Sequence, residues 1–408
     1  MIDTRLPPLS KRVEVPLYPQ KTKLPVIATL ASVNKLALLF TKILSCPIDN
    51  LLFTASASAG LYGYLKQLNQ PNIKVALPAF SCESLIEAVV QAGCIPVFTD
   101  IGPNVEVMIK NAKFAVTQGC NYFILPNYFG RRNPPERVMQ ILERGNIEII
   151  LDEAQSFTAL KRNTNPREYE RVKVVLFSFG ISKGVAGTGG GLLYMRKPDK
   201  ALKSLRRLVE FELTTNKSYF ERLRNALVEL IYLYSPKLVI NLGLKGKFYD
   251  RLDLLIERSS VVNLVKIGIN PIDAKVAYKN LKRQTKTASK HTRDWGELSD
   301  ALSTKLGAGS LMFLNGISGV PNIVAVCVNP SERYQLFCNL SLNNIQTTWY
   351  YFPMTEVERY SSYCSEALIN TPKVSSSIVI LPFQWQHSVY QRRHLIQVIK
   401  GLDMRHAV

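Results

Sequence analysis

A single lysine, Lys183, stands near the end of the stretch VVLFSFGISKG, residues 174–184. The apolar run that opens this stretch is typical of a buried strand, and a lysine just beyond such a strand is partly removed from water. Burial disfavours the charged form of an amine, so Lys183 becomes a usable nucleophile that can form a Schiff base with a carbonyl. A surface lysine in a loop is the simpler interpretation, and the residues around Lys183 argue against it.

A carboxylate and an amide close another apolar run, IILDEAQ, residues 149–155. Asp152 follows the apolar residues directly, and Gln155 comes three residues later. Pyridoxal phosphate (PLP) needs an acid beside its ring nitrogen, so that the ring stays protonated and accepts electrons. An amide such as Gln155 can hydrogen-bond the phenolic oxygen of the same ring. Asp152 could equally cap a helix, which is common for aspartate.

Two further features could hold a phosphate group. Ser178 lies five residues before Lys183 at the same strand exit, where its hydroxyl can bond a phosphate oxygen. The small residues FTASASAG, 53–60, precede a helical pattern, and the free N–H groups at a helix start favour an anion. Ser56 and Ser58 add hydroxyl groups there, although an ordinary capped helix would show the same pattern.

The loop after Lys183 is rich in glycine. We expect these residues to let the backbone pass close to a flat cofactor and to adopt positive φ before the next strand. The loop has neither the GxxxxGK[ST] spacing of a P-loop nor the GxGxxG spacing of a dinucleotide-binding turn. The glycines are Gly184, Gly187, Gly189, Gly190 and Gly191.

Short β-rich runs alternate with helical patterns up to about residue 200. This alternation predicts a mostly parallel sheet that is buried on both faces, with functional groups beyond the carboxyl ends of its strands. Residues 78–81, Asn127, 152–155 and 178–183 should therefore lie in one neighbourhood. The predicted strands are 73–80, 94–101, 120–130, 146–155, 172–180 and 190–196, and helices are predicted over 82–93 and 133–145.

The 408 residues are too many for a single core, so the chain should form a large and a smaller domain. Residues 1–25 resemble an extended arm, and 26–262 form the large domain, with a basic helical insertion over about 200–262. Residues 263–408 form a smaller α+β domain that begins with a long helix over 270–302.

The net charge is +20, from 51 basic and 31 acidic side chains, and it favours an anionic partner. Phosphorylated small molecules, nucleic acid and acidic membranes all fit the charge, but no nucleic-acid-binding motif is recognisable. Residues 225–245 are the most apolar segment. Glu229, Pro236 and Lys237 interrupt it, so a spanning helix is not expected and contact with a membrane surface is only an alternative to a buried helix pair.

Seven scattered cysteines without CxxC spacing favour reduced thiols in a cytoplasm, and the amino terminus has no signal-peptide pattern. The four histidines lie away from any cluster of cysteines or carboxylates, so no metal site is expected.

At these residues the sequence resembles the fold-type I PLP enzymes, and more narrowly the DegT/DnrJ/EryC1/StrS family. That family has a strand ending in Asp-x-Ala-Gln or Asp-x-Ala-His and a later Ser-Phe-x-x-x-Lys, which DEAQ and SFGISK match in order. AGCIPVFTDI matches a further family strand, and LPNYFG aligns Asn127 with a family histidine. The resemblance implies an α/β fold of type I, with a mostly parallel sheet of seven-stranded type and a smaller C-terminal α+β domain.

The resemblance also implies roles for individual residues. Lys183 would bind the cofactor covalently, Asp152 would pair with its ring nitrogen, and Gln155 would bond its phenolic oxygen. Ala57, in place of the usual glycine, would bind the phosphate together with Ser58 and Ser178. The position that stacks an aromatic side chain on the ring in many members aligns with Cys82, so Phe80 could cover the ring instead. Family members are usually dimers whose partner lends an asparagine, for which Asn270 is a candidate here.

The resemblance points to a PLP-dependent aminotransferase. Its donor would be an amino acid such as glutamate, and its acceptor a nucleotide-linked keto-sugar. Two alternatives stay open: a PLP enzyme acting on a non-sugar carbonyl, and a non-catalytic basic binding protein on the same fold. A family branch that dehydrates sugars carries histidine in place of the lysine, and Lys183 argues against that chemistry.

Overall fold

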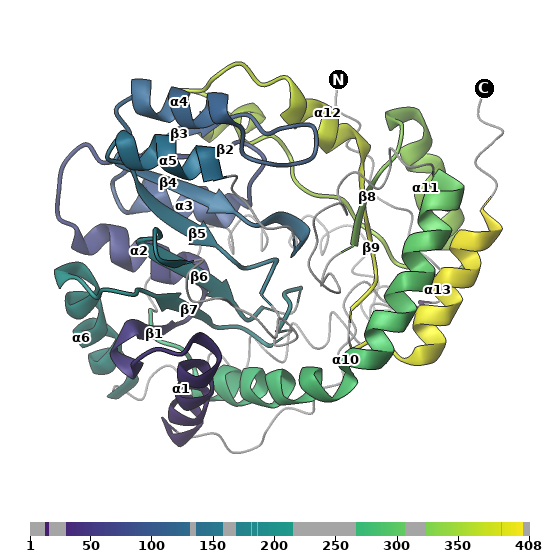
Figure 1. Cartoon of the computed structure of the whole chain (residues 1–408), viewed down its shortest axis with the longest axis horizontal. Coiled ribbons are helices and arrows are strands. Elements are labelled where there is room, and N and C mark those ends of the chain that lie inside the picture. The colour runs from purple at the N-terminus through teal and green to yellow at the C-terminus, as the bar shows by residue number, and fades with distance from the viewer. Residues whose placement is uncertain are drawn as a thin grey trace, which may run out of the picture.

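The computed structural model describes residues 13–15, 30–130, 136–157, 169–180, 182–185, 187–214, 267–306, 324–384 and 386–402. Seven strands form a central sheet in the order β1-β7-β6-β5-β4-β2-β3 (Figure 1). The strands are β1 (Leu51–Thr54), β2 (Lys74–Pro78), β3 (Ile95–Thr99), β4 (Tyr122–Pro126), β5 (Glu148–Asp152), β6 (Val174–Ser178) and β7 (Gly191–Tyr194).

The sheet is mostly parallel, as predicted. Strands β2 to β6 run parallel to one another, whereas β7 is antiparallel to both β1 and β6. Each of the six predicted strands is present, although each ends before the last residue of its predicted range. Strand β1 has no counterpart among the predicted strands, because its four residues merge with the small-residue turn that follows them.

Helices cover both faces of the sheet, because side chains along each strand point alternately to the two sides. In β6, Val175 and Phe177 pack into the core under α1, α4, α5 and the start of α10 (Pro271–Leu306), while Val174 and Leu176 pack under α2, α3 and α6. These helices are α1 (Leu30–Leu44), α2 (Ala57–Gln67), α3 (Glu83–Gln91), α4 (Ile109–Thr117), α5 (Glu136–Arg144) and α6 (Lys200–Thr214).

The C-terminal part is built around a two-stranded antiparallel sheet, β8 (Val324–Cys327) with β9 (Ile378–Leu381). Its own apolar core includes Leu298, Leu336 and Leu395, from α10, α11 and α13. The helices of this part are α11 (Pro330–Leu342), α12 (Asn370–Ser377) and α13 (Val389–Gly401). Short 3₁₀ helices occupy Ile48–Asn50, Tyr128–Gly130, Met354–Glu356 and Glu358–Tyr360.

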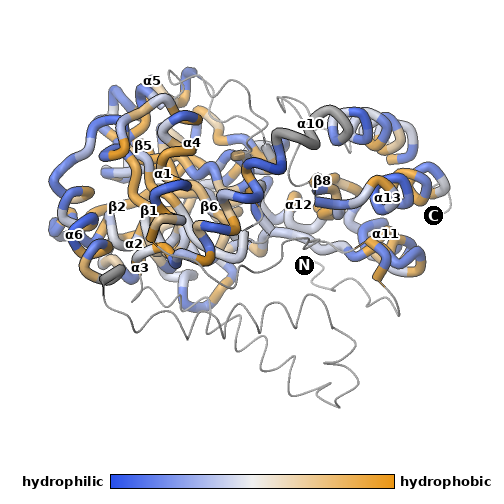
Figure 2. The backbone as a smooth tube through the Cα atoms, turned by 90° about the horizontal axis from the view of Figure 1, so that it is seen from below, coloured by the Kyte–Doolittle hydropathy of each residue, from blue (hydrophilic) through white to orange (hydrophobic). Residues whose placement is uncertain are grey.

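Helix α10 (Pro271–Leu306) connects the two parts. Its first half packs on α1 beside the seven-stranded sheet, and its second half packs on α13 (Figures 1 and 2). Figure 2 shows the hydrophobic stretches concentrated in the strands and the hydrophilic ones on the outer helices. Helix α10 contributes residues to both apolar cores. The predicted domain boundary near residue 262 lies outside the described residues and stays a prediction.

Several predicted segments lie outside the described residues. They include most of the N-terminal arm, of which Val15 is described and forms a parallel bridge with Ile345. The basic insertion is described only in α6, so the apolar segment 225–245 is not described. Within the described part of the chain, none of the helices combines the length and the apolar character that crossing a membrane requires.

Candidate active site

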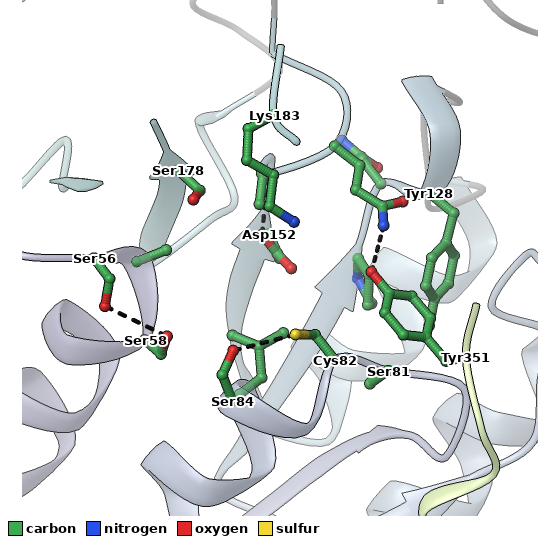
Figure 3. Close-up of a pocket in the computed structure, with 16 residues that line it drawn as sticks. Ser56, Ser58, Ser81, Cys82, Ser84, Tyr128, Asp152, Ser178, Lys183 and Tyr351 are labelled. Carbon is green, nitrogen blue, oxygen red and sulfur yellow. Dashed lines mark hydrogen bonds between the residues drawn. The ribbon is translucent and has the colours of Figure 1, made fainter. Parts of the chain in front are cut away.

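A cavity lies at the carboxyl ends of β4, β5 and β6, where the strand pattern placed the functional groups. Figure 3 shows its wall, which combines the start of α2, the start of α3, three strand ends and one residue of the C-terminal part. The cavity is lined by Ser56, Ala57, Ser58, Ser81, Cys82, Ser84, Leu85, Pro126, Asn127, Tyr128, Asp152, Ala154, Gln155, Ser178, Lys183 and Tyr351.

Lys183 enters the cavity from the loop after β6, and its side chain extends toward Asp152 (Figure 3). The Lys183 amide donates to the Gly180 carbonyl over 3.0 Å, which closes a turn after the strand. Helix α10 contacts this loop at two further residues. Gln284 donates from Nε2 to the Gly184 carbonyl, and the Thr188 hydroxyl donates to Asp273 Oδ1 over 2.6 Å.

Asp152 is the last residue of β5, and its Oδ1 accepts a hydrogen bond from the Ala154 amide over 2.9 Å. Burial raises the pKa of this carboxyl above its ordinary value, and the charge of Glu153 adds to the rise. The Ala154 N–H and the positive charge of Lys183 act in the opposite direction. A nearby cation stabilises the charged form of a buried carboxylate, and the protonated ring nitrogen of PLP would be such a cation.

Gln155 and Asn127 line the cavity, and both form side-chain hydrogen bonds within the protein. The side-chain oxygen of Gln155 accepts from the Phe129 amide over 3.1 Å, and its Nε2 donates to the hydroxyl of Tyr351. Asn127 donates from Nδ2 to Glu153 Oε1 over 2.9 Å. Both amide side chains are therefore fixed in orientation before any ligand binds.

The start of α2 forms an anion-binding edge of the cavity. Ser56 caps the helix by accepting the Ala59 amide at its Oγ over 3.0 Å. The first N–H groups of a helix have no partner within it, so Ala57 and Ser58 can offer theirs to a phosphate. Ala57 lacks a hydroxyl group, but a backbone donor needs none. Ser178, at the end of β6, lies on the same side of the cavity, above Ser56 and Ser58 in Figure 3.

The lysine loop is the segment between β6 and β7 that carries Lys183. In this loop and at the start of β7, glycines allow backbone segments to pack closely against each other. A Cβ on Gly187 would lie 2.4 Å from the Phe179 carbonyl oxygen, and one on Gly191 would lie 2.4 Å from the Ala57 nitrogen. Gly190 has the expected positive φ, of 94°. The expectation that all these glycines make room for a cofactor is therefore corrected, because Gly187 and Gly191 make room for neighbouring backbone.

Cys82, and not Phe80, faces the cavity. The Cys82 sulfur lies 3.2 Å from Ser84 Oγ at the start of α3. Phe80 is fully buried behind the wall, with its ring edge-on to Tyr128 and Tyr351 at centroid distances of 5.5 and 5.3 Å. A side chain in that position supports the rings that line the cavity, so the expectation that Phe80 covers a bound ring has no support in its placement.

Asn270 lies outside the cavity lining, at the start of α10. It is buried, and its Oδ1 accepts the Ile272 amide over 2.8 Å. This contact caps the helix within its own chain. A contribution of Asn270 to the phosphate site of a second subunit stays a prediction. Among the described residues, no group of three or more His, Cys, Asp or Glu side chains could hold a metal ion.

The cavity thus brings together Lys183, Asp152 and Gln155, with an anion-binding edge at the start of α2 and Ser178. These groups fit the aldehyde, the ring nitrogen, the phenolic oxygen and the phosphate of PLP. Tyr351 was missed from the sequence. The only signal was its place in TTWYYFP, residues 347–353, which nothing local connected to the lysine loop.

Comparison with known proteins agrees with this geometry. The family model described as the DegT/DnrJ/EryC1/StrS aminotransferase family matches residues 48–400, which is most of the chain. The protein belongs to this family. It is accordingly an aminotransferase, and its cofactor is PLP. Comparison with curated protein sequences gave no match.

Solved structures of low sequence identity share the fold. A DegT/DnrJ/EryC1/StrS aminotransferase from Brucella abortus is 19% identical, with a TM-score of 0.65 over 91% of this chain and 90% of that one. A Streptococcus pneumoniae protein described as a sugar aminotransferase in its PMP form is 15% identical, with a TM-score of 0.70 over 95% and 97%. DesI, studied with its TDP-sugar product, is 14% identical, with a TM-score of 0.62 over 91% and 84%.

Proposed function

We propose that this aminotransferase takes its amino group from glutamate and transfers it to a nucleotide-linked keto-sugar. The observation that carries the proposal is the convergence of Lys183, Asp152, Gln155 and the start of α2 on one cavity. A cytoplasmic homodimer is part of the same proposal, by analogy with the family.

The residues of the cavity divide the work of binding. Ser178, Ser58 and the backbone N–H groups at the start of α2 would hold the phosphate. Asp152 would hold the ring nitrogen in its protonated form, and Gln155 would donate to the phenolic oxygen. PLP, when bound, supplies the electron sink that lets a proton leave the α-carbon of the donor.

Lys183 performs the proton transfer in this proposal. Its amine would hold the cofactor covalently through the aldehyde and would be free once the donor has bound. As a free amine, Lys183 would accept the proton that leaves the donor α-carbon, would return it as a general acid, and would serve in the same two roles with the acceptor. The contact of the loop with α10 keeps this amine near the strand ends throughout.

A structural neighbour and the net charge of the chain both support a sugar acceptor. One of its structural neighbours, DesI, was studied with a TDP-sugar product. The net charge of +20 also suits a substrate that carries a diphosphate.

A non-sugar carbonyl is the second candidate acceptor, and two positions favour it. Ala57 and Cys82 depart from the residues usual in the family, and both line the cavity. A small thiol in place of an aromatic ring changes the shape of the wall next to the start of α3. Lys183 is also the one Lys or Arg among the lining residues, so the described part of the cavity has little charge for a diphosphate.

The absorption spectrum of the purified protein with PLP tests the proposal. The band of the lysine-bound cofactor should appear in the wild type and be lost in Lys183→Ala. Glutamate should bleach the band, and a nucleotide-linked keto-sugar should restore it. If only non-sugar carbonyls restore the band, the second candidate holds. If glutamate leaves the band unchanged while another amino acid bleaches it, the donor is wrong.

A further inference from the structure

Among the described residues that line the cavity, Tyr351 alone comes from the C-terminal part of the chain. All the others lie between residues 56 and 183, around the seven-stranded sheet. Figure 3 shows the Tyr351 ring beside Tyr128, with its hydroxyl directed toward the Gln155 amide. The C-terminal part therefore reaches the site through this side chain.

Packing on two sides fixes the orientation of the Tyr351 ring. It stacks on Tyr350 at a centroid distance of 5.2 Å and meets the edge of Phe80 at 5.3 Å. Its backbone carbonyl accepts the Ser375 hydroxyl of α12 over 2.7 Å. The hydroxyl of Tyr351 is thus held at a defined point of the wall by both parts of the molecule.

The hydrogen bonds of Gln155 settle which end of its amide meets Tyr351. A backbone N–H can only donate, so the end that faces the Phe129 amide must be the oxygen. The NH₂ group consequently faces Tyr351 and donates one proton to its hydroxyl oxygen. The amide of Gln155 cannot flip while both contacts persist.

We propose that Tyr351 is a positioning residue that aims the Gln155 amide at the phenolic oxygen of the cofactor. An NH₂ group carries two protons, and anchoring one of them fixes the direction of the other. This inference rests on the proposed role of Gln155. It makes the C-terminal part responsible for the electrostatics of the phenolic oxygen.

The proton affinity of the linkage between Lys183 and the cofactor reports on this hydrogen bond. A donor on the phenolic oxygen withdraws negative charge from it, so the oxygen holds the neighbouring proton less tightly. Tyr351→Phe should therefore shift the pH midpoint of the visible band upward, by about 0.5–1 pH unit if one ordinary hydrogen bond is weakened. Gln155→Ala should shift the midpoint in the same direction by at least as much.

The double variant separates positioning from general damage. If Tyr351 acts through Gln155, the midpoint of Tyr351→Phe with Gln155→Ala should equal that of Gln155→Ala alone. Tyr350→Phe is the matched control, because Tyr350 is the adjacent tyrosine and does not line the cavity. It should keep the wild-type midpoint, and the melting temperature of each apoprotein shows that the variants fold.

The outcomes separate this inference from the proposed function. A wild-type band that glutamate bleaches, with no midpoint shift in Tyr351→Phe, overturns the inference alone. Additive shifts in the double variant also overturn it, since Tyr351 would then act independently of Gln155. Absence of any band in the wild type would overturn the proposed function itself.

Discussion

At the scale of single residues, Asp152 shows how the site trades stability for binding. The unfolded carboxyl has its ordinary pKa, whereas burial raises the pKa in the folded chain. The folded state therefore binds more protons than the unfolded state between these two pKa values. Stability from this group is present at low pH and is lost as the pH rises through the folded pKa.

Asp152→Asn should consequently affect stability and turnover in opposite directions. The amide keeps the size of the side chain and removes a buried charge, so the melting temperature of the apoprotein at neutral pH should rise. Turnover should fall at least about 100-fold, because the ring nitrogen loses its charged partner. Melting curves of the apoprotein and single-turnover rates with glutamate check this, and a less stable apoprotein would contradict it.

Ser58 provides a second test at the residue scale. Its hydroxyl lies 3.5 Å from that of Ser56 at the start of α2. Ser58→Ala should weaken PLP binding about fivefold, the value of one ordinary hydrogen bond, and should weaken competition by inorganic phosphate by the same factor. Ser84→Ala is the control, because Ser84 lines the cavity at α3 instead. Equal losses in both variants would argue against a phosphate site at α2.

At the scale of elements, the lysine loop depends on a helix far from it in sequence. Gln284 of α10 is fully buried and contacts the residue after Lys183, 100 positions earlier in the chain. Asp273, in the first turn of the same helix, accepts a hydrogen bond from the Thr188 hydroxyl. The loop is therefore fixed between its own strand and α10, which limits where the Lys183 amine can move.

Gln284→Leu should release the loop while keeping α10 buried. Turnover should fall by about 10–100-fold, as expected for a catalytic group displaced by about 1 Å. The rate at which PLP attaches to Lys183 should fall as well, and stopped-flow absorbance measures it. Lys279→Ala, at an exposed position of the same helix, should change neither rate. An unchanged rate of attachment in Gln284→Leu would show that α10 does not position the lysine.

The sequence allowed the elements to be predicted better than their contacts. The strands of the parallel sheet were predicted because each is a short apolar run bounded by turns, and β6 with its lysine is the clearest of them. The position of Asp152 followed from the same pattern. Tyr351 and Gln155 lie 196 residues apart, and no periodicity connects such a pair.

At the scale of the whole molecule, buried polar groups join the two parts beside the site. Asp100, at the end of β3, accepts the amides of Ile369, Asn370 and Thr371 over 2.8–3.1 Å and so caps α12. Burial raises the pKa of Asp100, but these hydrogen bonds outweigh burial and hold it below its ordinary value. Ser375 of α12 donates to the Tyr351 carbonyl. The same helix therefore contacts both Asp100 and a residue that lines the cavity.

Another buried titratable group, His291 of α10, lies in the C-terminal part. Its ring stacks on Phe383 at a centroid distance of 4.9 Å. Burial above all, together with the charges of Arg392 and His387, lowers the pKa of His291 from 6.5 to about 3. Arg392 itself pairs with Asp294 over 2.5 Å, so the histidine stays neutral beside a fixed ion pair.

His291 should make the whole chain sensitive to mild acid. Between pH 6.5 and 3 the unfolded histidine binds a proton that the folded one does not, so stability is lost as the pH falls. At pH 4.5 the loss should approach about 2–3 kcal/mol. His291→Phe keeps a planar ring against Phe383 and should flatten urea-unfolding stability between pH 7 and 4.5. A His291→Phe curve that follows the wild type would instead assign the acid sensitivity to other groups.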